Sequence, residues 1–597
     1  MSKNNKLPHW DMSVIYPALD SDSFNAGYQA LMDNITQLNE LFDEHQIDRV
    51  NSHTFSEETV VSFEKIVEGV NQALSDFVTL RAYIFGFIAT DSRNATAQAK
   101  NSELLPYQAK LSLLNTRLTA WLGSLDVDAL IQNSSIAADH TYILRRAKVE
   151  AKHLMSPKEE ALASDLLVTG GSSWTRLFST YSSQLTVKVE LDGIEKEMSL
   201  TAAQNLMYNT DRSVRRHAHE QILKKLEETA VPMAACLNAI KGETLTLAYR
   251  RGWASPLDMV LFQNAIDRPT LDAMMMATRN AFPDFRRYLR ARARSLGLPV
   301  LAWYDRIVPL GKGNISWAYD DATQFVTKQF ETYSSKLAGM ATRAFSEGWI
   351  DAEPREGKRG GAFCMPLRGE ESRILSNFEP GFTSVGTLAH ELGHAYHNMN
   401  LAQRTRLQQS TPMTLAETAS TFCQKIVENA ALAKADEQDQ IIILDGLLEY
   451  AARVVLGASS NFLFEQRLFE KRDKRDLSVE ELCALDVEAQ RETTGDAVDS
   501  EQLHPYRWAY VPHYYVATYY NFPYTFGLLF GLGLYAQYQQ NPDEFRGGYD
   551  NLLSSTGMGD AAELASKFGI DLRDSAFWKS SLDILRRDID RFEALIE

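Results

Sequence analysis

The stretch from Thr383 to Glu417 constrains the fold of this chain more than any other part of the sequence. Between Thr387 and Asn398 the only charged or imidazole side chains are Glu391 and three histidines. A helix of that length on a solvated surface normally carries Lys, Glu or Arg along one face. A nearly uncharged helix that keeps one Glu is therefore expected to be buried, and a buried carboxylate needs a partner or a metal ion.

The same helix contains two glycines, Gly386 and Gly393. Each costs about 1 kcal/mol of helix propensity relative to alanine. Because such a cost needs a reason, the glycines predict that another segment of backbone approaches this helix closely.

Two of the three histidines are four residues apart, in the pattern His390-Glu391-Leu-Gly-His394. Residues at that spacing stack on one face of a helix, so both imidazoles can reach a single metal ion. Glu391 would project beside the ion, where a carboxylate can hold a water molecule bound to the metal. The pattern favours a zinc site over an ordinary core helix with hydrogen-bonded histidines.

A catalytic zinc site usually has three protein ligands, so a third must be found. The candidates are His397, Glu417 and Glu428. His397 lies on nearly the same helix face as His390, but a straight helix cannot easily bring a side chain two turns away onto the same ion. Glu428 is better explained as a surface or supporting residue. Glu417 is preferred because a turn at Ser410-Thr-Pro412 would fold its helix back on the first, although Thr414-x-x-Glu417 also has the spacing of a capping box.

Charge, cysteine content and apolar segments predict the location of the protein in the cell and the kinds of partner it binds. The net charge of −17 and the pI near 5.3 argue against nucleic acid as the main partner. The four cysteines lie far apart without a CxxC pair, which is typical of reduced thiols. The amino terminus has no apolar signal segment, and the most apolar stretch, Phe526 to Leu534, is too short to span a bilayer. We therefore expect a soluble cytoplasmic protein with no membrane association.

Most of the chain has helical periodicity, beginning with a succession of amphipathic helices over residues 24–150. Ser156-Pro157-Lys-Glu159 predicts a helix start, and Gly170-Gly171 predicts its end. Alternating residues on both sides of Asp192-Gly193 then predict a β-hairpin near residues 184–200. Since helical patterns resume at Thr201, we place an N-terminal helical lobe at residues 1–200 and a catalytic helical domain at residues 201–597.

A second short β element precedes the uncharged helix. Residues 361–365 and 373–378 flank a charged turn at residues 368–372. A strand edge beside a metal site can bind an extended peptide through main-chain hydrogen bonds. A structural hairpin with no ligand role explains the pattern equally well.

Several segments together resemble the oligoendopeptidase F branch of the thimet oligopeptidase family of zinc metallopeptidases. They are spread over nearly the whole chain and comprise Trp10-Asp-Met-Ser-Val-Ile-Tyr16-Pro, Trp303-Tyr-Asp305, the helix around His390, Ala-Glu417-Thr-Ala-Ser-Thr-Phe, and Arg507-Trp508-Ala-Tyr-Val-Pro512-His513-Tyr-Tyr. The resemblance implies a mainly α fold, a large multi-helix ellipsoid with a deep central channel and a small β-hairpin beside the active-site helix. It also implies one Zn2+ per chain at the channel floor, with His390, His394 and Glu417 as its ligands and Glu391 as the catalytic base.

The resemblance further implies that a histidine and tyrosines of a late aromatic segment grip the substrate and stabilise the oxyanion. Here that segment runs from His513 to Tyr524. His513 matches in its Val-Pro-His-Tyr-Tyr context, and among Tyr519, Tyr520 and Tyr524 we favour Tyr520 and Tyr524. Aromatic residues at these spacings are also typical of a protein core.

The expected activity is therefore zinc-dependent hydrolysis of internal bonds in short peptides, a step in peptide catabolism. Glu391 would take the proton of the zinc-activated water and pass it to the leaving amine. A helical metallocarboxypeptidase would use the same ligands and is the nearest alternative. A non-catalytic zinc-containing peptide-binding protein is a second alternative, against which the presence of Glu391 and all three proposed ligands argues.

Overall fold

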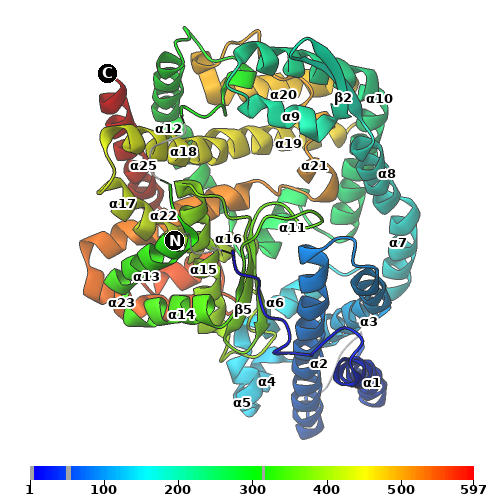
Figure 1. Ribbon diagram of the computed structural model, residues 1–597. Coiled ribbons are helices and arrows are strands. Elements are labelled where there is room, and N and C mark those ends of the chain that lie inside the picture. The colour runs from blue at the N-terminus through cyan, green and yellow to red at the C-terminus, as the bar shows by residue number, and fades with distance from the viewer. Residues whose placement is uncertain (1–5, 49–54, 312–315) are drawn as a thin grey trace. The chain divides into compact units, whose positions relative to one another are not determined.

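The structure is a computed structural model that describes residues 6–48, 55–311 and 316–597. Its internal contacts divide the chain into two compact units, each built from three separate segments of sequence. Unit 1 comprises Met1–Leu154, Ile315–Ala431 and Gln537–Phe568, and unit 2 comprises Met155–Asn314, Leu432–Ala536 and Gly569–Glu597. Both units are mainly helical, as the sequence predicted (Figure 1). The units do not coincide with the lobes expected at residues 1–200 and 201–597, and those lobes, the ellipsoidal shape and the channel stay predictions.

The first segment of unit 1 is a group of helices with one shared core. Its helices are α1 (Asp22–Glu44), α2 (Glu57–Thr90), α3 (Ala95–Ser124), α4 (Val127–Asn133), α5 (Ser135–Asp139) and α6 (Thr141–Ala151). Phe24, Phe63, Tyr83 and Trp121 are among the side chains buried in that core. By length and composition alone, α2 could cross a membrane. Phe63 and Tyr83 of this helix are fully buried in the core of the segment.

The remaining segments of unit 1 surround a small sheet and the helix that carries the histidine pattern. Their elements are α13 (Tyr319–Tyr333), α14 (Ser335–Ser346), β3 (Ile350–Asp351), β4 (Phe363–Arg368), β5 (Glu371–Leu375), α15 (Phe382–Leu401), α16 (Met413–Ala416), α17 (Ser420–Leu432), α23 (Pro542–Leu553) and α24 (Ala561–Ser566). The hairpin β4–β5 turns at Gly369, whose φ is +49°, and it packs on α15 (Figure 1). This confirms the predicted β element beside the helix. The short strand β3, which pairs with β5 in parallel, was not predicted.

Unit 2 contains the other hairpin and the longest helix. Its elements are α7 (Pro157–Thr169), α8 (Gly171–Ser183), β1 (Thr186–Leu191), β2 (Ile194–Ser199), α9 (Leu200–Asn205), η1 (Leu206–Tyr208), α10 (Arg212–Arg250), α11 (Pro256–Gln263), α12 (Arg268–Ser295), η2 (Trp303–Asp305), α18 (Glu437–Ala452), η3 (Arg453–Ala458), α19 (Ser459–Arg472), α20 (Val479–Thr494), η4 (Gly495–Ala497), η5 (Arg507–Ala509), α21 (His513–Val516) and α25 (Ser575–Ile596). The helix α22 (Phe522–Gln540) belongs to unit 2 as far as Ala536.

Local signals in the sequence set several of these elements. The capping box at the start of α7 forms as predicted, because Ser156 accepts from the Glu159 N–H and the Glu159 side chain accepts from the Ser156 N–H. The predicted hairpin is also confirmed, with Asp192 and Gly193 at φ of +55° and +77° in its two-residue turn. The helix α8, which starts directly at Gly171, was not predicted. The Gly171 N–H donates to Glu243 Oε1 on α10 at 2.9 Å, a contact from far along the chain.

Candidate active site

The site is built on α15, a helix whose flanking side chains are buried. Leu388, Ala389, Leu392 and Ala395 are all fully buried, as the uncharged sequence predicted. They fix the face from which His390, Glu391 and His394 project.

The two glycines of α15 have different roles. A Cβ atom at Gly393 would lie 2.5 Å from the Cα atom of Ser420 and 2.6 Å from the carbonyl oxygen of Ala419. The predicted close approach of another backbone is therefore confirmed at Gly393. At Gly386 no atom of the described residues, apart from the adjoining helix backbone, lies within 4 Å of the corresponding position, so the prediction is wrong there.

Three proposed metal ligands meet at one point in unit 1. Glu417 Oε2 lies 3.2 Å from His390 Nε2 and 3.4 Å from His394 Nε2, and all three ligand atoms lie within 4.8 Å of one another. Tetrahedral zinc, with bonds of about 2.0–2.2 Å to nitrogen and oxygen, separates neighbouring ligand atoms by about 3.3–3.5 Å. Two imidazoles and a carboxylate at these separations therefore fit a zinc ion.

Glu417 reaches this point because it lies in the break between α16 and α17, rather than at the start of one long helix. The capping-box alternative does not form, since α16 begins after Pro412 and has no side-chain cap. Ser420 Oγ donates to Glu417 Oε2 at 2.5 Å and steadies the carboxylate. Burial raises the pKa of Glu417, but the hydrogen bond from His390 and the charges of both imidazoles lower it more, so the carboxylate stays ionised.

Glu391 lies beside the ligands and is 5% exposed. Its Oε2 atom is buried and has no hydrogen-bond partner among the described residues. Burial raises its pKa to about 7, partly offset by the charge of His390. A buried oxygen without a partner, on a carboxylate that titrates near neutral pH, is suited to accept a proton from a water molecule.

The other nitrogen of His390 is held by a chain of hydrogen bonds on α17. Gln424 Nε2 donates to Glu428 Oε1 at 2.7 Å, so Gln424 Oε1 is left to accept from His390 Nδ1 at 2.9 Å. This keeps a proton on Nδ1, so Nε2, which faces Glu417, is the nitrogen that would bind a metal once its own proton is displaced. Glu428 is 5% exposed and supports the site through Gln424, whereas the surface alternative for it is wrong. Gln424 was not predicted, because its spacing of four residues from Glu428 is its only signal in the sequence.

The two histidines proposed as ligands, His390 and His394, differ in their pKa values when no metal is bound. For His390, burial lowers the pKa, but Glu417 raises it more through its hydrogen bond and charge, and the pKa reaches about 9. For His394, burial dominates and lowers the pKa to about 4. A divalent cation would therefore displace a proton from His390 when it binds.

His397, the alternative third ligand, is directed elsewhere. It is 4% exposed, and its Nε2 atom lies 2.8 Å from Thr556 Oγ1 in the segment after α23. That contact links α15 to the last segment of unit 1.

The residues expected to grip the substrate form a separate cluster, in unit 2. The ring centres of His513 and Tyr520 are 4.5 Å apart, those of Tyr520 and Tyr524 are 5.5 Å apart, and those of His513 and Tyr524 are 6.2 Å apart. Tyr519, by contrast, is 4% exposed and packs on Phe462 in the core. The structure thus groups the two tyrosines favoured from the sequence with His513 and separates the third from them.

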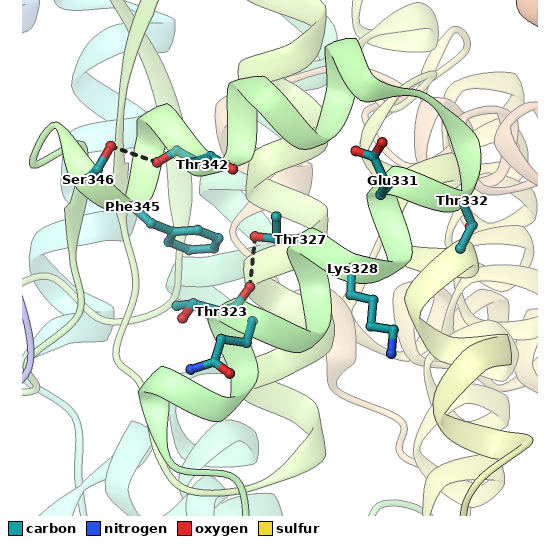
Figure 2. A pocket seen from close by; sticks show the side chains of 9 residues that line it. Thr323, Thr327, Lys328, Glu331, Thr332, Thr342, Phe345 and Ser346 are labelled. Atoms are coloured by element: carbon teal, nitrogen blue, oxygen red, sulfur yellow. Dashed lines mark hydrogen bonds between the residues drawn. The ribbon is translucent and has the colours of Figure 1, made fainter.

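A groove of about 860 Å3 lies between α13 and α14 in unit 1 (Figure 2). Its hydroxyl groups are satisfied by their own helices, as when Thr327 Oγ1 donates to the Thr323 carbonyl and Ser346 Oγ to the Thr342 carbonyl. Lys328 and Glu331 are its charged lining residues. The groove contributes none of the candidate metal ligands.

Comparison with known proteins gives consistent relatives. The model of the family described as Peptidase family M3 matches residues 205–584 of this chain. A second family model, described as Oligopeptidase F, matches residues 122–186. Oligoendopeptidase F (plasmid) of Lactococcus lactis subsp. cremoris is 23% identical, with 100% of this chain and 99% of that protein covered. Oligopeptidase PepF of Bacillus subtilis is 22% identical, with 100% and 89% covered.

Solved structures share the fold over the whole length. Oligoendopeptidase-F from Enterococcus faecium has a TM-score of 0.70 at 18% identity, covering 97% of this chain and 99% of that chain. A structure from Chlamydophila abortus has a TM-score of 0.81 at 19% identity, covering 98% of both chains.

Proposed function

Because the chain belongs to peptidase family M3 and is a metalloendopeptidase, we propose that its metal is zinc and that it cuts internal bonds of short peptides. One observation carries the proposal. His390, His394 and Glu417 present three ligand atoms within 4.8 Å of one another, and the unpartnered carboxylate oxygen of Glu391 lies on the same helix as two of them.

In the proposed mechanism each of these residues has one role. When bound, zinc would polarise the carbonyl to be cut and acidify the attacking water. Glu391 takes a proton from that water through Oε2 and passes it to the nitrogen of the leaving amine. Gln424 holds the His390 ring so that Nε2 faces the ligand position. His513, Tyr520 and Tyr524 bind the substrate and donate to the oxyanion, a role that rests on the resemblance of their segment.

The proposal is tested with an internally quenched short peptide. We expect turnover that a chelator abolishes and that stoichiometric zinc restores. Glu391→Gln is expected to keep its zinc and lose roughly 100-fold or more in kcat, since it cannot accept the proton. His394→Ala is expected to lose the metal itself, which elemental analysis of the purified variant measures. Substantial turnover by Glu391→Gln would overturn the assignment of the base.

The metallocarboxypeptidase alternative is separated by the products. A peptide blocked at both ends is still cut by an endopeptidase, but not by an enzyme that needs a free carboxyl terminus. Mass spectrometry of the fragments distinguishes the two. A zinc-loaded protein that binds the peptide but never cuts it would instead support the non-catalytic alternative.

A further inference from the structure

Two sequence segments singled out above, around Trp303 and Arg507, meet within unit 2. The guanidinium carbon of Arg507 lies 5.5 Å from the centre of the Trp303 ring, and that of Arg306 lies 4.2 Å from it. Two cationic side chains therefore pack on one indole, a favourable contact for each. The two arginines differ in their hydrogen-bond and ion-pair partners.

Arg507 is fully partnered. Its Nε donates to Asp486 Oδ1 at 2.9 Å, and its Nη2 donates to Ser460 Oγ at 2.9 Å. Asp486 is fully buried and also accepts from the Trp508 N–H. This buried ion pair is complete within the fold and has no need of a ligand.

Arg306 lacks such partners. Within the described part of the chain, its side chain takes part in no hydrogen bond and no ion pair, and its Nε atom is buried without a partner. The residue as a whole is only partly exposed. A polar atom such as this Nε, buried without a hydrogen bond, is costly to keep.

The side chains around Arg306 carry more positive than negative charges. The charged groups that act on it are Arg507, Glu449 and Arg453. Glu449 Oε1 lies 3.0 Å from Arg453 Nε in an ion pair, although it has no hydrogen-bond partner among the described residues, and Arg507 is neutralised by Asp486. Three guanidinium groups thus face two carboxylates. Burial and the nearby Arg507 lower the pKa of Arg306 to about 10, so it remains charged at neutral pH.

The backbone beside this cluster is irregular in a way that often accompanies function. Between α18 and α19 the helix passes through the π-helical turn η3, which starts at Arg453. Turns of this kind are rare in proteins as a whole, but those that occur often lie at functional sites. The Oγ atom of Ser459, directly after the turn, is also buried without a partner among the described residues.

We propose that Arg306 is a subsite for a carboxylate group of the peptide substrate. Its planar guanidinium can bind a carboxylate through two parallel hydrogen bonds, and its stacking on Trp303 fixes the plane of that fork. The inference rests on the proposed peptidase function. Arg507, on the same Trp303 ring, begins the segment that leads to His513, so the cluster and the substrate-gripping residues share one stretch of chain. The carboxylate is either the carboxyl terminus of the peptide or an Asp or Glu side chain.

The test compares one peptide in three forms on the zinc-loaded enzyme. The first has a free carboxyl terminus and no acidic side chain, the second is its C-terminal amide, and the third is the amide with one internal Glu. The wild-type protein is expected to show a KM about 10- to 100-fold lower for a carboxylate form than for the plain amide. Whichever form gains identifies the source of the carboxylate.

Arg306→Gln is expected to remove that preference while leaving the kinetics of the plain amide close to wild type. Arg475→Gln is the matched control, because Arg475 is an exposed arginine of unit 2 paired with Glu481, and it should keep the preference. Arg306→Lys retains the charge without the fork and should keep part of the preference. If Arg306→Gln does not fold, the preference of Arg306→Lys for the carboxylate forms is measured in its place.

Binding is measured separately from turnover, by fluorescence anisotropy of the same peptides on zinc-loaded Glu391→Gln protein with and without Arg306→Gln. If no peptide is cut, the proposed function fails while this measurement still tests Arg306. Equal binding of all three forms by the protein with Arg306 intact would overturn the subsite, as would an unchanged preference after Arg306→Gln.

Discussion

Gln424 illustrates at the scale of one residue how a neutral side chain can orient a proposed metal ligand. It accepts from His390 Nδ1 because its amide nitrogen is committed to Glu428. Such outer contacts orient a ligand ring and keep its basicity high.

Gln424→Leu retains the volume and removes the hydrogen bond, so we expect zinc affinity to fall about 10- to 100-fold. Competition with a chromophoric chelator at fixed pH measures this. Gln424→Glu keeps an acceptor and should retain most of the affinity. The control is Gln466→Leu, since Gln466 donates to Glu470 with the same spacing on α19 in unit 2. Unchanged affinity in Gln424→Leu would show that His390 is held by other contacts.

The residues of this site could be predicted from the sequence to different extents. His390, Glu391 and His394 follow from helical spacing alone, because one helix turn places them together. Spacing could only favour Glu417 over its competitors, since the position of this residue depends on the break between α16 and α17. Gln424 and Arg306 could not be found, because their roles are defined by which groups surround them in the folded chain.

At the scale of elements, the contact of α15 with the start of α17 sets the spacing of the proposed metal ligands. Gly393 permits that contact, and Glu417 lies three residues before Ser420, whose backbone Gly393 meets. A change at Gly393 should therefore affect both stability and the metal site.

Gly393→Ala would place a methyl group 2.5 Å from backbone that cannot rotate away. We expect the helix and residues 419–420 to separate, at a cost of about 1–3 kcal/mol, with lower zinc content. Gly386→Ala is the matched control, because its new methyl group meets no atom within 4 Å in the described part of the chain beyond the adjoining helix backbone. It should be neutral or stabilising by up to about 1 kcal/mol. Thermal unfolding and elemental analysis compare the two, and equal behaviour would contradict the role of Gly393.

The elements predicted correctly are those with strong local chemistry. The α7 capping box and the Asp192-Gly193 turn need only adjacent residues to form. The elements that were missed depend on distant residues. The helix α8 starts where Gly171 meets Glu243, and β3 exists because it pairs with β5.

At the scale of the whole molecule, each unit is assembled from three segments separated by long stretches of the other unit. Local periodicity cannot reveal which helices share a core, because it reports on one element at a time. The expected boundary near residue 200 followed the order of elements along the chain. The interleaving of the two units depends on contacts between segments hundreds of residues apart.

Buried neutral histidines make the stability of the folded chain depend on pH. In unit 2, His219 and His504 are 4% and 2% exposed, with ring centres 5.4 Å apart. Burial lowers the pKa of His219 to about 4, and burial together with the nearby His219 and Arg507 holds that of His504 well below its ordinary value. Both rings are therefore neutral in the folded state and take up a proton on unfolding below about pH 6.5. Because the unfolded chain binds more protons, the free energy of unfolding falls as the pH falls from 6.5 towards 4.

His219→Phe keeps an aromatic ring beside Tyr304 and His504 but cannot titrate. For His219 the shift amounts to about 3 kcal/mol of stability lost between pH 6.5 and 4, so the variant should lose that much less than the wild type over this range. Urea unfolding at a series of pH values measures the difference. Carboxylates titrate equally in both proteins, so the comparison isolates the histidine. Parallel curves for the two proteins would mean that His219 gains its proton without unfolding, and that the interior of unit 2 admits charge more easily than its packing indicates.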